Sequence, residues 1–322
     1  MKMGKTIIAL TMGLVAATAA HAQEGDLVVY NPAGDAGDQV IAAFQAKYPN
    51  ITVSTINAGV GEVFTRMNAE KANPRGDAVL CASSEAFMAN PGLFASYESK
   101  EAANFSPDVI GPDNTYYGCT MPLQAFIVNT NLLDDATAPK SWKDLADPEF
   151  KGKLELANPS LSGSAYAQMA QMLQLYGWDT VGKVMANAKF VTSSEAVFQD
   201  VGRGEIEIGV TGEANIKTMI DEGYPVKAVY PEDGTGLRFD ASAIIKGGPN
   251  PDNAKLFLDF ANSKEAHEII ASTNRRSVRK DVAAPEGLAP TADIKTFPYD
   301  AAMAAANRDE NLAHWDELFS KK

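Results

Sequence analysis

The stretch ANPSLSGSAYAQMAQMLQLYG, residues 157–177, joins a turn of small polar residues to a helix. Its larger apolar side chains recur at helical spacing, at Tyr166, Met169, Leu173 and Tyr176. Gly177 is the expected end of that helix. In the first turn of a helix the backbone N–H groups have no partner and the dipole leaves partial positive charge. The stretch therefore predicts either an anion site or an ordinary serine N-cap at Ser162, Gly163, Ser164 and Ala165.

Outward from this stretch, short β-rich runs alternate with amphipathic helical segments from Leu27 onward. The β-rich runs include LVVY, ITVSTI, DAVLC, QAFIVNT and EIEIGVT. This alternation predicts an α/β architecture with largely parallel sheets. The carboxyl ends of such strands meet at one edge of the sheet, where ligands bind. The polar turns there make candidates of Asp35, Ser83, Ser84 and Ser193, each of which could instead cap the next helix.

The N-terminus has the pattern of a secretory signal peptide. Lys2 and Lys5 precede the apolar run IIALTMGLVAATAA, and residues 20–22 read AHA, a small-x-small cleavage pattern. We expect cleavage after Ala22, so that the mature chain begins at Gln23. No cysteine lies at that position and no later segment has the roughly 20 apolar residues of a membrane span. The sequence predicts an exported protein without a lipid anchor.

Length and charge limit the partners. About 300 mature residues exceed the usual single domain, which predicts two lobes. The formal charge is −13, and −15 without the two leader lysines, which disfavours nucleic acid and anionic membranes. An anionic ligand must therefore be held by local donors. Cys81 and Cys119 would form a disulfide in an oxidising compartment or stay as two small buried residues, and both alternatives remain open.

Three longer phrases carry a family resemblance. They are DLADPEFKGKLELANPSLSGSAYAQ, FQDVGRGEIEIGVTGEA and FDASAIIKGGPNPDNAKLFLDFANSKEA. With them the chain resembles a type II periplasmic solute-binding protein of an ABC importer, in the branch that binds ferric iron or phosphorylated solutes. The resemblance implies two α/β lobes joined by a crossover-strand hinge, with the ligand cleft between them. It also implies a periplasmic monomer that delivers a small molecule to a membrane permease.

Within that branch the serine-glycine turn before the helix binds a phosphate or a synergistic anion, in agreement with the local reading. Iron-binding members place two adjacent tyrosines after the strand that corresponds to EIEIGV. This chain has Thr211-Gly212-Glu213-Ala214 there, so the phenolate ligands are missing. We therefore expect a small phosphate- or phosphonate-bearing solute, such as a sugar phosphate or an aminoalkylphosphonate. Ferric iron with a synergistic anion, and a polyamine or carboxylate, are the alternatives.

Charged residues complete the expected site. The resemblance places an arginine opposite the anion, a role open to Arg275 or Arg276, with Arg238 as a competitor. A guanidinium offers phosphate a bidentate fork. Glu213 and Asp240 are expected to recognise a hydroxyl or amine of the ligand.

No enzyme, cofactor or metal centre is expected, since the chain has neither GxSxG nor a serine or cysteine with a histidine base. The domain prediction is a first lobe of residues 23–122 and 240–322, including the C-terminal helices, and a second lobe of residues 123–239. We expect the crossovers near residues 122–128 and 236–242.

Overall fold

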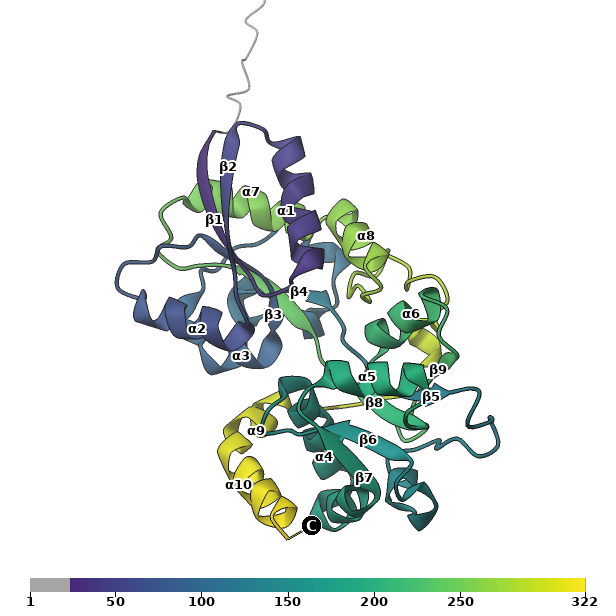
Figure 1. Cartoon of the computed structure of the whole chain (residues 1–322). Helices are drawn as coiled ribbons and strands as arrows, with labels where there is room; N and C mark the ends of the chain where they lie inside the picture. The colour runs from purple at the N-terminus through teal and green to yellow at the C-terminus, as the bar shows by residue number, and fades with distance from the viewer. Residues whose placement is uncertain (1–23, 322) are drawn as a thin grey trace, which may run out of the picture.

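The computed structural model describes residues 24–321. The predicted signal peptide and its cleavage site lie outside these residues. No helix within residues 24–321 combines the length and the hydropathy needed to cross a membrane. The described chain forms two α/β lobes, one above the other in Figure 1, and each has its own buried core. The predicted two-lobed α/β fold is confirmed.

The first lobe is built on a five-stranded sheet with the order β2-β1-β3-β11-β4. Its strands are β1 (Gly25–Asn31), β2 (Ile51–Asn57), β3 (Ala78–Ser83), β4 (Tyr117–Thr120) and β11 (Asp240–Ile244). β1 runs parallel to β2 and β3, whereas β11 is antiparallel to β3 and β4 because it returns from the other lobe. The helices are α1 (Asp35–Lys47), α2 (Val60–Ala69), α3 (Ser84–Ala89), α7 (Pro251–Ala261) and α8 (Lys264–Ser272).

The second lobe repeats this plan with the strand order β7-β6-β8-β5-β9. Its strands are β5 (Gln124–Asn129), β6 (Leu154–Ala157), β7 (Ala188–Val191), β8 (Ile208–Gly212) and β9 (Val226–Val229). β6 is parallel to β7 and β8, and β5 is antiparallel to β8 and β9. The helices are α4 (Gly163–Asn187), α5 (Ser194–Arg203) and α6 (Glu213–Asp221). All three begin just after a strand of this sheet, so their N-termini share one edge.

The quoted stretch forms the helix that its apolar spacing predicts. α4 breaks at Gly177, whose φ of 71° and ψ of −178° are not helical, and a further helical segment follows. A positive φ is favourable only for glycine, which explains why the first segment ends there. Tyr166 and Met169 are buried in the second lobe.

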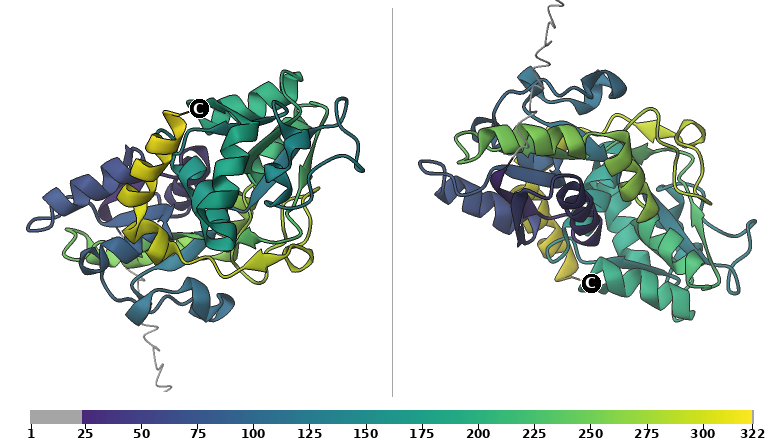
Figure 2. Two further views of the ribbon diagram at one scale, coloured as in Figure 1. Left: turned by 90° about the horizontal axis from the view of Figure 1, so that it is seen from below. Right: turned by 90° about the horizontal axis from the view of Figure 1, so that it is seen from above.

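The C-terminal helices correct the predicted domain boundary. α9 (Ala301–Ala306) and α10 (Arg308–Phe319) lie beside α4, as Figures 1 and 2 show. Ala304 and Trp315 belong to the core of the second lobe, and the Tyr166 hydroxyl donates to the Ala304 carbonyl. Trp315 is 2% exposed. Residues 301–319 therefore contribute to the core of the second lobe, which buries the indole, while α9 also contacts α3 of the first lobe.

Within residues 24–321 the chain crosses between the lobes three times. Residues 121–123 join β4 to β5, and residues 237–239 join the short strand β10 (Thr235–Gly236) to β11. A third passage leads from Arg279, which bonds Glu101 in the first lobe, to β12 (Thr296–Phe297), which pairs with β10. Cys81 and Cys119 form a disulfide that ties β3 to β4 across β11. Of the two alternatives that the sequence left open for these cysteines, the structure has the disulfide, which lies close to the first crossing.

Candidate functional site

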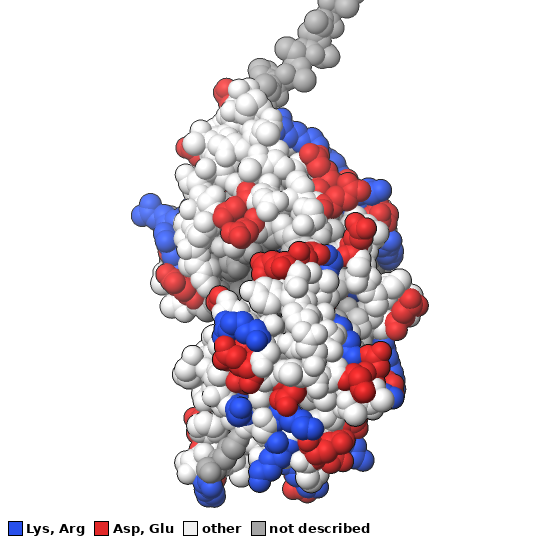
Figure 3. Space-filling model, turned by 45° about the vertical axis from the view of Figure 1, so that its right-hand side comes forward, with Lys and Arg blue, Asp and Glu red and all other residues white. Residues whose placement is uncertain are grey.

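A cavity of about 300 Å³ lies between the lobes where the chain crosses. The surface is hollowed between the lobes in the space-filling view, where acidic and basic side chains are interspersed (Figure 3). The lining residues are Thr120, Met121, Pro122, Gln124, Gly163, Ser164, Gly212, Glu213, Ala214, Asn215, Arg238, Asp240, Arg275 and Arg276. They come from both lobes and from two of the crossings, so a ligand here would touch both lobes and the hinge between them.

One wall is the serine wall, formed by the N-termini of α4 and α5. The hydroxyls of Ser162, Ser164 and Ser194 bond one another, with Oγ–Oγ distances of 3.2 Å, 3.0 Å and 2.6 Å. Ser162 also caps α4 by accepting from the Ala165 N–H. Gly163 has no side chain, and it lines the cavity beside Ser164. The wall thus offers hydroxyls and the positive ends of two helix dipoles without any charged side chain.

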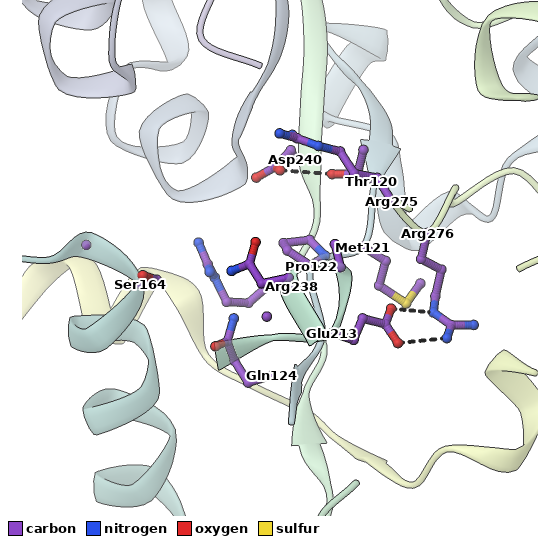
Figure 4. A pocket seen from close by; sticks show the side chains of 14 residues that line it. Thr120, Met121, Pro122, Gln124, Ser164, Glu213, Arg238, Asp240, Arg275 and Arg276 are labelled. Carbon is purple, nitrogen blue, oxygen red and sulfur yellow. Dashed lines mark hydrogen bonds and ion pairs between the residues drawn. The ribbon is translucent and has the colours of Figure 1, made fainter. Parts of the chain in front are cut away.

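Gln124 adds a donor between this wall and the hinge, as Figure 4 shows. Its Oε1 accepts from Gln168 Nε2 at 2.8 Å, which fixes the side chain in its orientation. The amide NH₂ is then directed away from that bond, and Gln124 lines the cavity. An anion at Ser164 would find this neutral donor nearby.

Asp240 lies on the opposite side of the cavity from Ser164 (Figure 4). The Thr120 hydroxyl donates to Asp240 Oδ2 at 2.9 Å, while Oδ1 has no hydrogen bond within the described chain. Burial raises the pKa of the Asp240 carboxyl, an effect opposed by the guanidinium of Arg238 and the Thr120 hydrogen bond. A partly buried carboxylate with one unused oxygen is an acceptor for an ammonium or a hydroxyl group.

Arg238 is paired with an acid of the first lobe. Its Nε and Nη2 donate to the two carboxylate oxygens of Glu85, at 2.5 Å and 3.1 Å. Burial alone would lower the pKa of Arg238, but the Glu85 carboxylate outweighs it and raises the pKa above its usual value. The guanidinium stays charged, with its fork occupied by Glu85.

Arg276 and Glu213 form a clamp across the hinge. Arg276 Nε and Nη2 donate to the two oxygens of Glu213 at 2.7 Å and 2.8 Å, and the Tyr230 hydroxyl donates to Glu213 Oε2 at 2.6 Å. The side chains of Arg276 and Glu213 are 1% and 2% exposed. Arg276 also donates to Thr291 and to the Ala289 carbonyl. Both residues border the cavity, yet their polar groups bond to each other.

Arg275 is the arginine of the cavity without a carboxylate in contact. It makes no hydrogen bond or ion pair within residues 24–321, although it is only partly exposed. Its side chain extends over the Asp240–Thr120 pair in Figure 4, and its charge acts on the Asp240 carboxyl. Its neighbour Arg276 anchors the loop that carries it. Of the three arginines considered from the sequence, Arg275 has a free guanidinium.

The structure brings together most of the predicted site. Gly163, Ser164, Glu213, Asp240, Arg275 and Arg276 line the cavity, and Ser162 and Ala165 support it through the cap. The other four candidates do not line it. Asp35 opens α1, Ser83 and Ser84 lie at the start of α3, and Ser193 caps α5 by accepting from the Ala196 N–H. For Ser193 the structure therefore shows helix capping, the alternative to ligand contact that the sequence left open.

Several residues that line the cavity were not predicted from the sequence. Thr120, Met121, Pro122 and Gln124 surround the first crossing, and Asn215 lies in the first turn of α6. Their position between two predicted strands, where the chain changes lobes, is the signal that could have found them. Glu85 does not line the cavity itself, and it contributes by pairing with Arg238.

Comparison with known proteins agrees with this geometry. Residues 78–305 match the bacterial extracellular solute-binding protein family. The chain belongs to this family. An uncharacterised protein of Haemophilus influenzae is 34% identical over 275 residues, which cover 81% of this chain and 79% of that one. The function class expected from the sequence, a binding component of an ABC importer, is confirmed.

Two further binding proteins have named ligands. A periplasmic protein of Salmonella typhimurium, proposed by its name to bind 2-aminoethylphosphonate, is 30% identical over 253 residues, with 73% of this chain and 72% of that one covered. The solved structure of AfuA from Actinobacillus pleuropneumoniae, with bound fructose-6-phosphate, is 26% identical. It superimposes with a TM-score of 0.78 over 92% of this chain and 99% of that one. The expected type II periplasmic binding fold is confirmed.

Proposed function

We propose that this binding protein captures a small solute bearing a phosphate or phosphonate group between its lobes. The observation that carries the proposal is the serine wall, where Ser162, Ser164 and Ser194 gather at two helix N-termini on the side of the interlobe cavity. A dianion needs several convergent donors in a chain with a formal charge of −13. These hydroxyls and helix ends supply them locally.

The free N–H groups of α4 strengthen the wall. The Gly163 and Ser164 N–H groups lack a hydrogen-bond partner among the described residues, as expected for the first turn of a helix. A phosphonate oxygen placed there would accept from these groups and from the Ser164 hydroxyl. Charge-assisted bonds of this kind each contribute about 1.5–3 kcal/mol. The ligand's anionic end would thus be held by the second lobe before closure.

Closure would then bring the first lobe to the other end of the solute. Asp240 and Arg275 lie on that side, so the closed state gains contacts that the open state lacks. We propose that the importer's membrane permease recognises this closed form in the periplasm and that the protein acts as a monomer after loss of its signal peptide. The ligands named for the Salmonella protein and for AfuA carry the same kind of group, which supports the assignment.

Binding without catalysis is part of the proposal. The hydroxyl partners of Ser164 are two other serines, and no histidine lines the cavity described here, so a nucleophile would lack its base. Ferric iron is less well supported. Neither tyrosine nor histidine occurs among the lining residues, and residues 24–321 contain no group of three His, Cys, Asp or Glu side chains able to hold a metal ion.

A thermal-shift panel on ligand-stripped protein tests the proposal. The ligands are 2-aminoethylphosphonate, fructose-6-phosphate, inorganic phosphate, ferric citrate, spermidine and malonate. A ligand at about 100 times its Kd adds roughly 2.7 kcal/mol to the free energy of unfolding, which shifts Tm by several degrees. We expect shifts with phosphorus compounds. A shift with ferric citrate, spermidine or malonate and none with phosphorus compounds would overturn the proposal.

A further inference from the structure

Some charged side chains of the cavity have an ion partner and others have none. This difference limits which chemical groups the ligand can carry at the end away from the serine wall. Two of the three arginines have a bidentate carboxylate, Glu85 for Arg238 and Glu213 for Arg276. The charges of these four side chains therefore neutralise each other in two ion pairs. The remaining charges of the lining are one guanidinium, Arg275, and one carboxylate, Asp240.

These two incomplete groups lie side by side at the end away from the serine wall. Figure 4 shows Arg275 extending over Asp240, with Ser164 on the opposite side of the cavity. Asp240 keeps Oδ1 without a partner, because Thr120 bonds only Oδ2. Among residues 24–321 no ion pair joins Arg275 to Asp240, so each keeps its capacity for a ligand group.

An ammonium group alone would fit this end poorly. It would pair with Asp240 but would lie beside the Arg275 guanidinium, and like charges that are only partly exposed to solvent repel each other. A carboxylate next to the ammonium removes that conflict, because it accepts the bidentate fork that Arg275 offers. A neighbouring ammonium and carboxylate are the two substituents of an α-amino acid.

We propose that the solute is an amino acid with a phosphonate or phosphate on its side chain, whose ammonium group pairs with Asp240 and whose carboxylate pairs with Arg275. This deepens the proposed function and rests on it, because the serine wall holds the phosphorus group. At about 30 Å³ per water-sized group, a cavity of about 300 Å³ holds roughly ten such groups, enough for a short phosphono amino acid.

Calorimetry with three matched ligands tests the proposal on the full mature protein. Ethylphosphonate carries the phosphonate alone, 2-aminoethylphosphonate adds the ammonium, and 2-amino-3-phosphonopropionate adds the carboxylate. We expect the affinity to rise only slightly when the ammonium is added and about tenfold or more when the carboxylate is added, and we expect one enantiomer of the last compound to bind much more tightly than the other. Equal or weaker binding of both enantiomers relative to 2-aminoethylphosphonate would overturn the proposal.

Two variants separate the roles of the charged groups. Arg275→Gln should abolish the advantage of the carboxylate and leave the Kd of 2-aminoethylphosphonate unchanged or lower. Asp240→Asn should abolish the advantage of the ammonium and leave the Kd of ethylphosphonate nearly unchanged. If Arg275→Gln weakened all three ligands equally, the guanidinium would serve the phosphonate and the amino acid assignment would fail. If no phosphorus compound bound the wild type while spermidine or ferric citrate did, the proposed function itself would fail.

Discussion

The two ends of the cavity are built in different ways. The serine wall consists of uncharged donors at two helix N-termini, and all three of its serines lie within residues 162–194 of the second lobe. The other end is charged, and its Thr120, Asp240 and Arg275 come from three distant parts of the chain. The residues of the serine wall are close together in the sequence, and their hydrogen-bond donors are positioned by the two helix N-termini alone. The second exists only because the lobes are joined by several crossings.

This contrast explains how the ends can divide the work of recognition. At the serine wall an anion is held by the fixed dipoles of two helices, so no charged side chain has to be removed from water. The charged end is selective, because a partly buried carboxylate or guanidinium left without a partner is costly. Affinity for the phosphorus group should therefore depend on the serine wall, and discrimination between solutes on the charged end. The experiments below test whether the ends are separable in this way.

The largest effect is expected when the clamp behind the charged end is broken. Arg276→Met leaves the buried Glu213 carboxylate without its ion partner, which should lower the free energy of unfolding by about 3–5 kcal/mol in urea titrations. The control Arg66→Met removes a partly exposed pair with Glu70 and should cost under about 1 kcal/mol. Adding Glu213→Gln to Arg276→Met should restore part of the loss. A loss as small as the control's would show that the clamp does not hold the hinge.

The next effect concerns the serine wall. Replacing Ser164 and Ser194 together by alanine should weaken 2-aminoethylphosphonate binding about 100-fold, because two donors to a charged group are lost. Calorimetry measures the Kd. Ser193→Ala is the matched control: it removes the cap of α5 and should lower stability by about 1 kcal/mol without changing the Kd. An equal loss of affinity in the control and in the double variant would contradict the division of roles.

A buried acid behind the serine wall should make stability depend on pH. Burial, followed by the charge of Asp200 on α5, raises the pKa of Glu155 to about 7, with smaller effects of Lys189 and Glu205. A raised pKa means that the folded state keeps a proton that the unfolded state loses. The resulting stabilisation is complete below the ordinary pKa of 4.5 and is lost as the pH rises through about 7.

Comparison with Glu155→Gln isolates this contribution. The unfolding free energy of the wild type, relative to that of the variant, should fall by roughly 2 kcal/mol between pH 4.5 and pH 8. Urea titrations at four pH values measure it. A difference that stays constant across this range would show that the pKa of Glu155 is the same in the folded and the unfolded state.

The smallest effect is expected at the charged end itself. Because burial raises the pKa of Asp240, its ionised form disfavours the folded state, and Asp240→Asn should raise the Tm of the ligand-free protein by about 1–2 °C at pH 7. The gain should vanish at a pH below the ordinary aspartate range, where the wild-type side chain is protonated in both states. A lower Tm for the variant at pH 7 would show that Asp240 supports the fold and is not held ready for a ligand.

The same contrast decides what the sequence could predict. The helix ending at Gly177 and the serine turn before it follow from apolar spacing and turn chemistry, which are local. The pairing of Arg276 with Glu213 could not be predicted, because it depends on how the loop after α8 meets the start of α6. The packing of Ala304 and Trp315 into the core of the second lobe could not be predicted for a similar reason. Burial of Trp315 shows in the sequence as an apolar position, but the surface that buries it does not.

The most direct test is a crystal structure of the ligand-stripped protein soaked or grown with 2-aminoethylphosphonate. We expect the phosphonate within hydrogen-bond distance of the Ser164 and Ser194 hydroxyls, and the ammonium at Asp240. A phosphonate bound at Arg275, with the serine wall in contact only with water, would contradict the account.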